Sequence, residues 1–222
     1  MKTSVFQYGP GIILEKYDKN IVDIQNEGGG HKFAARTVYQ IGIQLIEMIE
    51  KLHSIGFIHN DIRPKNIYVD HNNKLKLINF SKATPYIKDL KTFREPNGSN
   101  DHIEVGYKNF KGDIRFCSPN HLKKKQSSRR DDCFSVMYII LYLLTEKIPF
   151  EYEDMQNEDN IRRFIVKKCT EAPRDFCGDN NYKNIEEFVR EIYSYHFRSK
   201  PEYSKLKFLL EREILLLNEI PS

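Results

Sequence analysis

The stretch HNDIRPKN, residues 59–66, places a carboxylate, a cation and an amide within six positions. Asp61 on a tight loop can accept a proton from a hydroxyl group, and Arg63 can neutralise a transferring phosphoryl group. Asn66 can offer its amide oxygen to a magnesium ion. A loop that leads into a hairpin can bring these three side chains around one point, so the stretch predicts a site for a hydroxyl group beside a metal ion.

The segments around this stretch predict a mainly α-helical fold with few strands. Two apolar runs, NIYVD (66–70) and LKLINF (75–80), flank HNNK and favour a β-hairpin. Before them, apolar residues recur at spacings of three and four between Ala34 and Ser54, which predicts an amphipathic helix. These residues are Val38, Ile41, Leu45, Met48 and Leu52. After the hairpin, residues 84–128 are polar and irregular and predict a long loop.

The C-terminal half of the chain predicts helices, and the N-terminal residues predict a strand and a loop. Cys133–Leu144 is apolar on nearly every side and predicts a helix at the centre of the core, and amphipathic helices follow near 184–197 and 202–219. At the other end, SVFQYGPGIIL (4–14) predicts a strand that ends at a Gly-Pro-Gly turn. The polar residues 17–31 predict a loop.

Composition is that of an ordinary globular protein. The 222 residues carry a formal net charge of +4, with 40% hydrophobic and 30% charged residues. The four cysteines are scattered without zinc-ligand spacing, and the start of the chain lacks the apolar core of a signal peptide. The longest apolar run, VMYIILYLL (136–144), is too short to cross a bilayer. We therefore expect an intracellular protein, cytoplasmic or nuclear, with no membrane or nucleic-acid motif.

The stretch HNDIRPKN resembles the catalytic loop of protein kinases, His-Arg-Asp, four residues and Asn. The residues NFS (79–81) fall where that family has Asp-Phe-Gly, and GDIRFCSPN (112–120) resembles the end of the activation segment. SRRDDCFSVMYIILYLL (128–144) and KPEYSKLKFLL (200–210) resemble helical segments of casein kinase 1 and the vaccinia-related kinases. These motifs, in the family order over about residues 4–210, imply a protein-kinase-like fold.

The resemblance assigns a role to each matching residue. Asp61 matches the catalytic base, and Arg63 stands where the family usually has a catalytic lysine. Asn66 matches a ligand of the second magnesium ion. His59 matches a structural histidine of the loop, and Asp132 matches the central-helix carboxylate that braces it.

Several positions depart from the family pattern. Asn79 replaces the aspartate that bridges magnesium to the nucleotide phosphates; it is either a weak magnesium ligand or a structural substitute that fills the same space. Loss of that charge predicts a rate lower by about a thousandfold or more, at tenfold per ~1.4 kcal/mol. Ser81 replaces a glycine, Asn60 replaces the arginine that anchors the activation segment, and Asn120 replaces the glutamate that closes it.

The family also has a β-rich lobe that carries a glycine-rich loop and a phosphate-pairing lysine. No GxGxxG motif and no Val-Ala-Ile-Lys-like lysine occur in the sequence. The resemblance therefore implies a single domain over 1–222, with a hinge strand at about 4–11, a helical C-terminal lobe at about 12–220 and no N-terminal β-lobe.

Three arginines are candidates for binding an anion or a phosphorylated substrate: Arg115, Arg129 and Arg130. Arg115 matches an arginine that the casein kinase 1 family uses near phosphorylated substrate residues. The alternative is that Arg129 and Arg130 form internal salt bridges with Asp131 or with acidic neighbours.

Two functions remain open. The first is a pseudokinase that is inactive or severely impaired and acts as a binding or regulatory module. Its partner is a kinase, a substrate or a second copy that covers the surface left by the absent lobe, and the chain alone needs no cofactor. The alternative is a Ser/Thr kinase that transfers the γ-phosphate of ATP, with magnesium, to protein hydroxyl groups, its β-lobe missing from this sequence or supplied by another chain.

Overall fold

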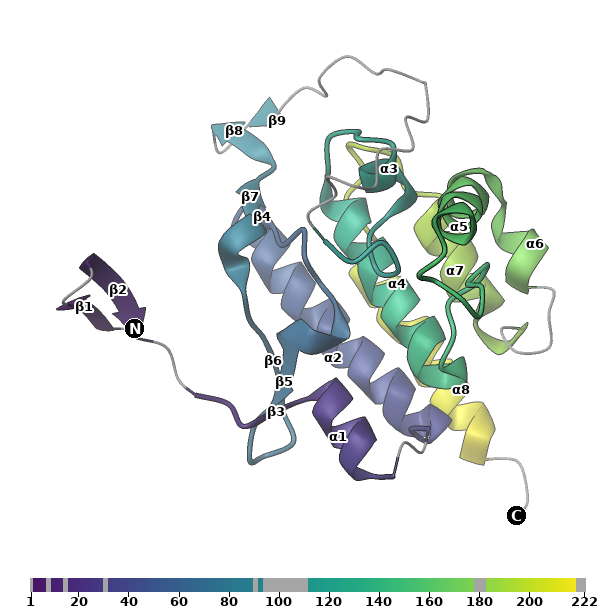
Figure 1. Cartoon of the computed structure of the whole chain (residues 1–222), viewed down its shortest axis with the longest axis horizontal. Coiled ribbons are helices and arrows are strands. Elements are labelled where there is room, and N and C mark those ends of the chain that lie inside the picture. Colours follow the sequence, from purple (N-terminus) through teal and green to yellow (C-terminus); the bar gives the residue numbers. More distant parts are fainter. Residues whose placement is uncertain are drawn as a thin grey trace.

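A computed structural model describes residues 2–6, 9–13, 16–29, 32–89, 92–93, 112–177 and 183–218. Most of the described residues are helical, and the strands are short and gathered at one end (Figure 1). This agrees with the mainly α-helical fold that the sequence predicts.

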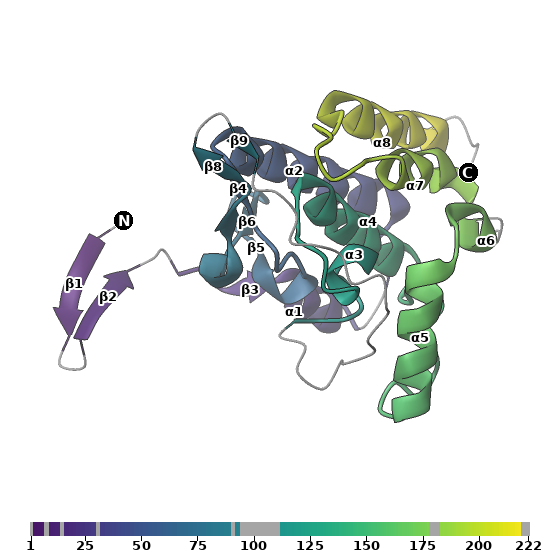
Figure 2. The same ribbon diagram turned by 90° about the horizontal axis from the view of Figure 1, so that it is seen from above.

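Three long helices form the centre of the fold. The helices α2 (Ala35–Ser54), α4 (Arg129–Thr145) and α8 (Tyr203–Asn218) run side by side in both views (Figures 1 and 2). Gly42 permits their close approach, because a Cβ atom there would lie 2.6 Å from a methyl group of Ile140 and 2.8 Å from one of Leu210. The predicted amphipathic helix is thus confirmed as α2, and it packs on both neighbours.

The helix α4 is buried on almost all sides, as its uniformly apolar sequence predicts. It begins at Arg129, four residues before its predicted start at Cys133, because Ser128 is its N-cap residue. The backbone N–H of Ser128 donates to the carboxylate of Asp131 at 2.7 Å, one half of a capping box. This start places Asp132 in the first turn of the helix.

The predicted hairpin is also confirmed. The strands β5 (Ile67–Val69) and β6 (Leu75–Leu77) are antiparallel, with Ile67 opposite Leu77, and β3 (Lys19–Asn20) adds a third strand beside β5. The loop that precedes the hairpin contains the 3-10 turn η1 (Pro64–Asn66).

The N-terminal region differs from the prediction in two ways. Residues 17–31 were expected to form a loop, but they include α1 (Ile21–Glu27), because the side chain of Asn20 accepts from two backbone N–H groups at its start. The expected single hinge strand near 4–11 is a hairpin of β1 (Lys2–Phe6) and β2 (Gly9–Ile13). The Gly-Pro-Gly sequence lies inside β2, where proline is tolerated because a two-stranded sheet has only edge strands.

Short elements complete the described chain. The strand β4 (Phe57–Ile58) pairs with β7 (Thr84–Pro85), and β8 (Ile87–Asp89) pairs with β9 (Thr92–Phe93). The expected long loop of 84–128 thus contains strands and the short helix α3 (Pro119–Leu122), and residues 94–111 lie outside the described part. The remaining elements are η2 (Phe80–Lys82), α5 (Glu158–Thr170), α6 (Pro173–Cys177), η4 (Lys183–Ile185) and α7 (Glu186–Tyr193).

The last two helices match the predicted amphipathic pair, although α7 is shorter than the expected range 184–197. Among the described residues, no helix combines the length and the apolar character that crossing a membrane requires.

Candidate functional site

Asp132 on α4 holds the start of the loop of residues 59–66 through hydrogen bonds to its backbone. Its carboxylate accepts hydrogen bonds from the backbone N–H groups of His59 (2.7 Å) and Asn60 (3.0 Å), and its Oδ2 lies 2.9 Å from Nε2 of His53. Burial alone would raise the pKa of Asp132, but these hydrogen bonds and the histidine hold the pKa below its usual range. The structure therefore places a buried carboxylate where the resemblance assigned the brace of the loop.

His59 is fully buried and connects the loop to the hairpin. Its Nε2 lies 3.1 Å from the carbonyl oxygen of Ile78, and its Nδ1 lies 3.2 Å from the backbone N–H of Asp61. An N–H donates to Nδ1 while Nε2 donates to a carbonyl, which is the pattern of a neutral imidazole. Burial lowers the pKa of His59 and favours that neutral form. His59 therefore has a structural position rather than one suited to proton transfer.

Asp61 and the two predicted amide ligands lie together. Nδ2 of Asn66 donates to the backbone carbonyl of Asp61 at 2.7 Å and to its carboxylate at 3.2 Å. Nδ2 of Asn79 lies 3.4 Å from the same carboxylate and 3.4 Å from Oδ1 of Asn66. Asn79 adopts the left-handed conformation with φ of 65°, which asparagine tolerates better than most residues. The loop and the NFS stretch thus converge as the sequence predicts.

Two cations surround the Asp61 carboxylate. Nε of Arg63 lies 3.6 Å from Oδ1, and the ammonium group of Lys82 lies 3.1 Å from the same oxygen. The sequence analysis did not single out Lys82. Lys82 reaches Asp61 because it ends the 3-10 turn η2, which follows the left-handed Asn79 and directs the chain back toward the loop of residues 59–66. No short-range pattern in the sequence signals that return.

In this arrangement the amide of Asn79 is not oriented as a metal ligand. Both amides direct N–H groups toward Asp61, and the Asn79 oxygen accepts from the Ser81 hydroxyl at 2.8 Å. The reverse orientation of Asn79 would set its amide oxygen against a carboxylate, which electrostatics disfavours. The geometry favours the reading of Asn79 as a structural substitute over that of Asn79 as a weak magnesium ligand.

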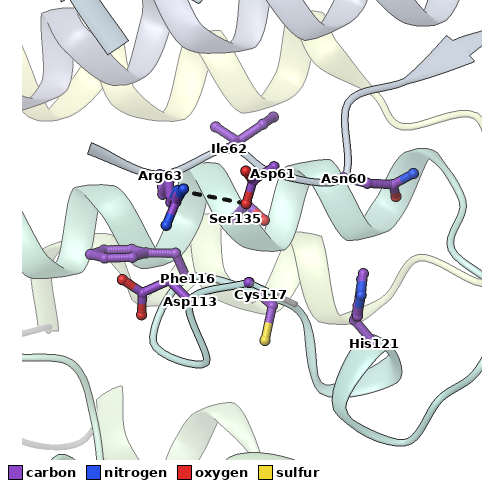
Figure 3. A pocket seen from close by; sticks show the side chains of 10 residues that line it. Asn60, Asp61, Ile62, Arg63, Asp113, Phe116, Cys117, His121 and Ser135 are labelled. Atoms are coloured by element: carbon purple, nitrogen blue, oxygen red, sulfur yellow. Dashed lines mark ion pairs between the residues drawn. The ribbon is translucent and has the colours of Figure 1, made fainter. Parts of the chain in front are cut away.

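A small pocket opens to solvent beside Asp61. Figure 3 shows Asp61 and Arg63 on one side of it and Asp113, Phe116 and Cys117 on the other. Those three residues belong to a tight turn, in which the backbone N–H groups of Phe116 and Cys117 donate to the carbonyl of Asp113 at 3.1 and 3.2 Å. The pocket therefore has one wall from the loop and one from the turn at residues 113–117.

The three candidate anion-binding arginines make internal contacts. Arg115 lies 3.3 Å from Asp113 and 3.8 Å from Glu151, which neutralise its charge. Arg129 is buried and donates to the carbonyl of Arg198 at 3.0 Å. Arg130 lies 3.9 Å from Asp131, the internal salt bridge that the alternative reading expected. This geometry agrees with the internal salt bridge for Arg130, whereas the contact of Arg129 is with a backbone carbonyl.

Comparison with known proteins identifies the family of the chain. The family described as protein kinase domain matches residues 11–207. The chain belongs to the protein kinase family. This confirms the predicted resemblance at the level of the family.

Curated relatives of this kinase-family chain point to the casein kinase 1 group. A probable casein kinase I homolog of Encephalitozoon cuniculi is 29% identical over 81% of this chain and 55% of its own length. A casein kinase 1-like protein of Oryza sativa is 26% identical over 90% of this chain and 28% of its own. A probable serine/threonine-protein kinase of Dictyostelium discoideum is 23% identical over 90% and 38%. The chain thus spans about a quarter to just over half the length of these relatives.

Proposed function

We propose that this kinase-family chain is a binding or regulatory module of the casein kinase 1 and vaccinia-related type, with phosphotransfer absent or severely impaired. One observation carries the proposal: the position of the metal-binding aspartate holds Asn79, whose amide donates toward Asp61, while the Lys82 ammonium pairs with Asp61. In this proposal the cationic side chains of the chain itself, and not a metal ion, balance the charge of Asp61.

The charge balance supports this proposal. Arg63 and Lys82 carry two positive charges within 3.6 Å of one oxygen of Asp61, which carries a single negative charge. A magnesium ion placed beside this group meets two cationic side chains that compete for Asp61, and the further side-chain ligands that the described part of the loop and the NFS stretch offer it are neutral amides. Losing about 4 kcal/mol of transition-state stabilisation lowers a rate by about a thousandfold, so the missing carboxylate alone is a severe loss.

A protein partner is the ligand that we propose for the module, either a kinase, a kinase substrate or a second copy of the chain. Three large apolar side chains near the loop and its flanking strands are exposed, namely Ile55, Phe57 and Phe80. Phe80 packs one face against His59, with ring centroids 4.8 Å apart, yet half of its surface faces solvent. Exposed aromatic surface next to a site is typical of a contact with another protein.

A second candidate function is a Ser/Thr protein kinase that uses ATP and magnesium, with a β-lobe from elsewhere in the protein or from another chain. The observation that favours it is the intact loop geometry. Asp61 and Asn66 are hydrogen-bonded to each other, and Asp132 braces the loop from α4. In this candidate function the ion pair between Lys82 and Asp61 must break, so that Asp61 can accept a proton from the substrate hydroxyl.

A phosphotransfer assay separates the two candidates. Purified chain is incubated with radiolabelled ATP, magnesium and dephosphorylated casein, with Asp61→Ala as the matched blank. We expect the chain and the blank to transfer equally little label. Transfer by the wild-type chain that disappears in Asp61→Ala would establish the kinase alternative.

Metal titration tests the observation that carries the proposal. We expect no magnesium-dependent rise in Tm, with or without ATP, for the wild type. The double variant Asn79→Asp with Lys82→Met should gain such a rise, because a second carboxylate replaces the amide and the competing ammonium is gone. Lys76→Met, which removes an exposed lysine paired with Asp70, serves as the control. A magnesium-dependent rise in the wild type itself would contradict the charge argument.

A further inference from the structure

Lys168 is a fully buried lysine on α5, with 1% of its surface exposed. Its ammonium group donates to the backbone carbonyls of Ile114 at 2.8 Å and Arg115 at 2.5 Å. These carbonyls belong to the turn at residues 113–117, which is one wall of the pocket beside Asp61. The lysine thus links a helix more than 50 residues later in the chain to the wall of the candidate site.

The surroundings of this ammonium group are unusual. Among the described residues, no carboxylate lies within 4 Å of it, and the ring of Tyr138 on α4 lies 3.7 Å away. The ionisable groups that face it are Cys117 and Asp113 in the turn, Cys169 on its own helix, and Glu151. Burial raises the pKa of Cys117 to about 12, so this thiol is neutral and does not act as a counter-ion.

Burying an ammonium group without a carboxylate is costly, so its partners matter. The carbonyls of an irregular turn have no partners in a helix or sheet, and a buried carbonyl needs a donor. Two charge-assisted hydrogen bonds and a cation–π contact stabilise the buried ammonium group, and the same hydrogen bonds supply donors to the turn carbonyls. An apolar side chain of the same length would fill the space, remove the donor to the Arg115 carbonyl and leave the Ile114 carbonyl with the weak thiol donor of Cys117 at 3.5 Å.

We propose that Lys168 is a positioning residue that holds the turn at residues 113–117 in the shape that completes the pocket beside Asp61. The lysine acts on the site through the backbone of the turn and does not reach the pocket itself. This inference is independent of the proposed function, because it applies equally to a pocket that binds a partner and to one that binds a substrate.

Amide hydrogen exchange of the turn provides the direct test. In Lys168→Met at pH 7, we expect the amides of Phe116 and Cys117 to exchange at least tenfold faster than in the wild type. The amides in the middle of α4 should exchange at the wild-type rate. Lys168→Gln keeps an uncharged donor and should fall between the two. Lys167→Met, on an exposed lysine of the same helix, is the control.

Two results of this test would overturn the proposal. In one, the Phe116 and Cys117 amides of folded Lys168→Met exchange as in the wild type. In the other, protection is lost equally across α4, which would make Lys168 a general stabiliser of the fold rather than a positioning residue for the turn.

A pH profile adds a readout that a purely space-filling role would not change. Burial lowers the pKa of Lys168 to about 8 from 10.5, so the unfolded chain binds more protons between these values. The folding equilibrium constant of the wild type should therefore rise relative to Lys168→Met by about twentyfold from pH 7 to pH 9.5. A ratio that stays constant would show that the ammonium is not held in this buried position.

Discussion

Replacing Asp132 with asparagine removes the negative charge that accepts hydrogen bonds from the backbone of the loop of residues 59–66. The carboxylate is 1% exposed and accepts from two backbone N–H groups and from the His53 ring. Asparagine offers one oxygen, so its NH₂ group must face at least one of these buried donors. An unsatisfied buried donor costs about 1–3 kcal/mol, and more where the lost acceptor is charged; Asp132 accepts from three such donors.

We therefore expect Asp132→Asn to lower the free energy of unfolding by about 3–5 kcal/mol. That is a large share of the roughly 5–15 kcal/mol typical of a domain. Urea unfolding followed by circular dichroism measures it, provided that the m-value is unchanged. Asp159→Asn, at an exposed position on α5, is the matched control and should stay within about 0.5 kcal/mol of the wild type.

The acid side of the pH profile checks the cause. Because the folded chain holds the pKa of Asp132 below its usual value, this carboxylate contributes stability above the unfolded pKa of about 4 and loses it as pH falls through the lower folded pKa. The stability difference between the wild type and Asp132→Asn should shrink from pH 5 to pH 3. A loss of less than 1 kcal/mol at pH 7, or a difference that does not depend on pH, would refute the reasoning.

Three further substitutions test the packing around the site, each by thermal or urea unfolding. Gly42→Ala should cost about 1–3 kcal/mol because the new methyl group meets Ile140 at 2.6 Å, whereas Gly28→Ala, with its nearest contact at 3.5 Å, should change little. Asn60→Ala should cost about 1–3 kcal/mol, since it strains a φ of 63° and removes two side-chain hydrogen bonds; a neutral result would show that the αL backbone is not strained. Tyr203→Phe removes the hydroxyl 2.7 Å from the buried histidine of α2 and should cost about 1 kcal/mol; full wild-type stability would indicate that the ring finds another partner.

Long-range apolar patterns predicted the helical part of the fold well. The helix α4 is apolar on nearly every side and is buried on nearly every side, and α2 shows the three-and-four spacing of its buried face. The loop at 59–66 was predictable because its carboxylate and amide are close in the sequence. Such local patterns determine local structure, and they identified Asp61 and Asn66 as neighbours.

Sequence reasoning missed features that depend on tertiary contacts. Lys167 and Lys168 are adjacent in a polar helix, and only the packing of α5 on the turn decides that Lys168 is the buried one. Lys82 reads as an ordinary exposed lysine until η2 brings it to Asp61. The helix α1 was missed for a different reason: its Asn20 cap and the Asp23 that completes the capping box are a local signal within a polar stretch that was interpreted as a loop.

Two asparagines explain how the site keeps its shape while its charges differ from the family pattern. Asn60 and Asn79 both adopt the left-handed conformation, with φ of 63° and 65°, and both stand where the resemblance expects a charged residue. Asparagine suits this conformation, so neither position adds much backbone strain. Nδ2 of Asn60 donates to the carbonyl of Lys82 and to the hydroxyl of Thr84. These two hydrogen bonds hold residues 82–84 against the loop, with Lys82 beside Asp61. The amides therefore maintain the geometry of the loop, and the lysine supplies the positive charge. The two asparagines thus preserve the backbone path of the loop at positions where the resemblance expects charged side chains.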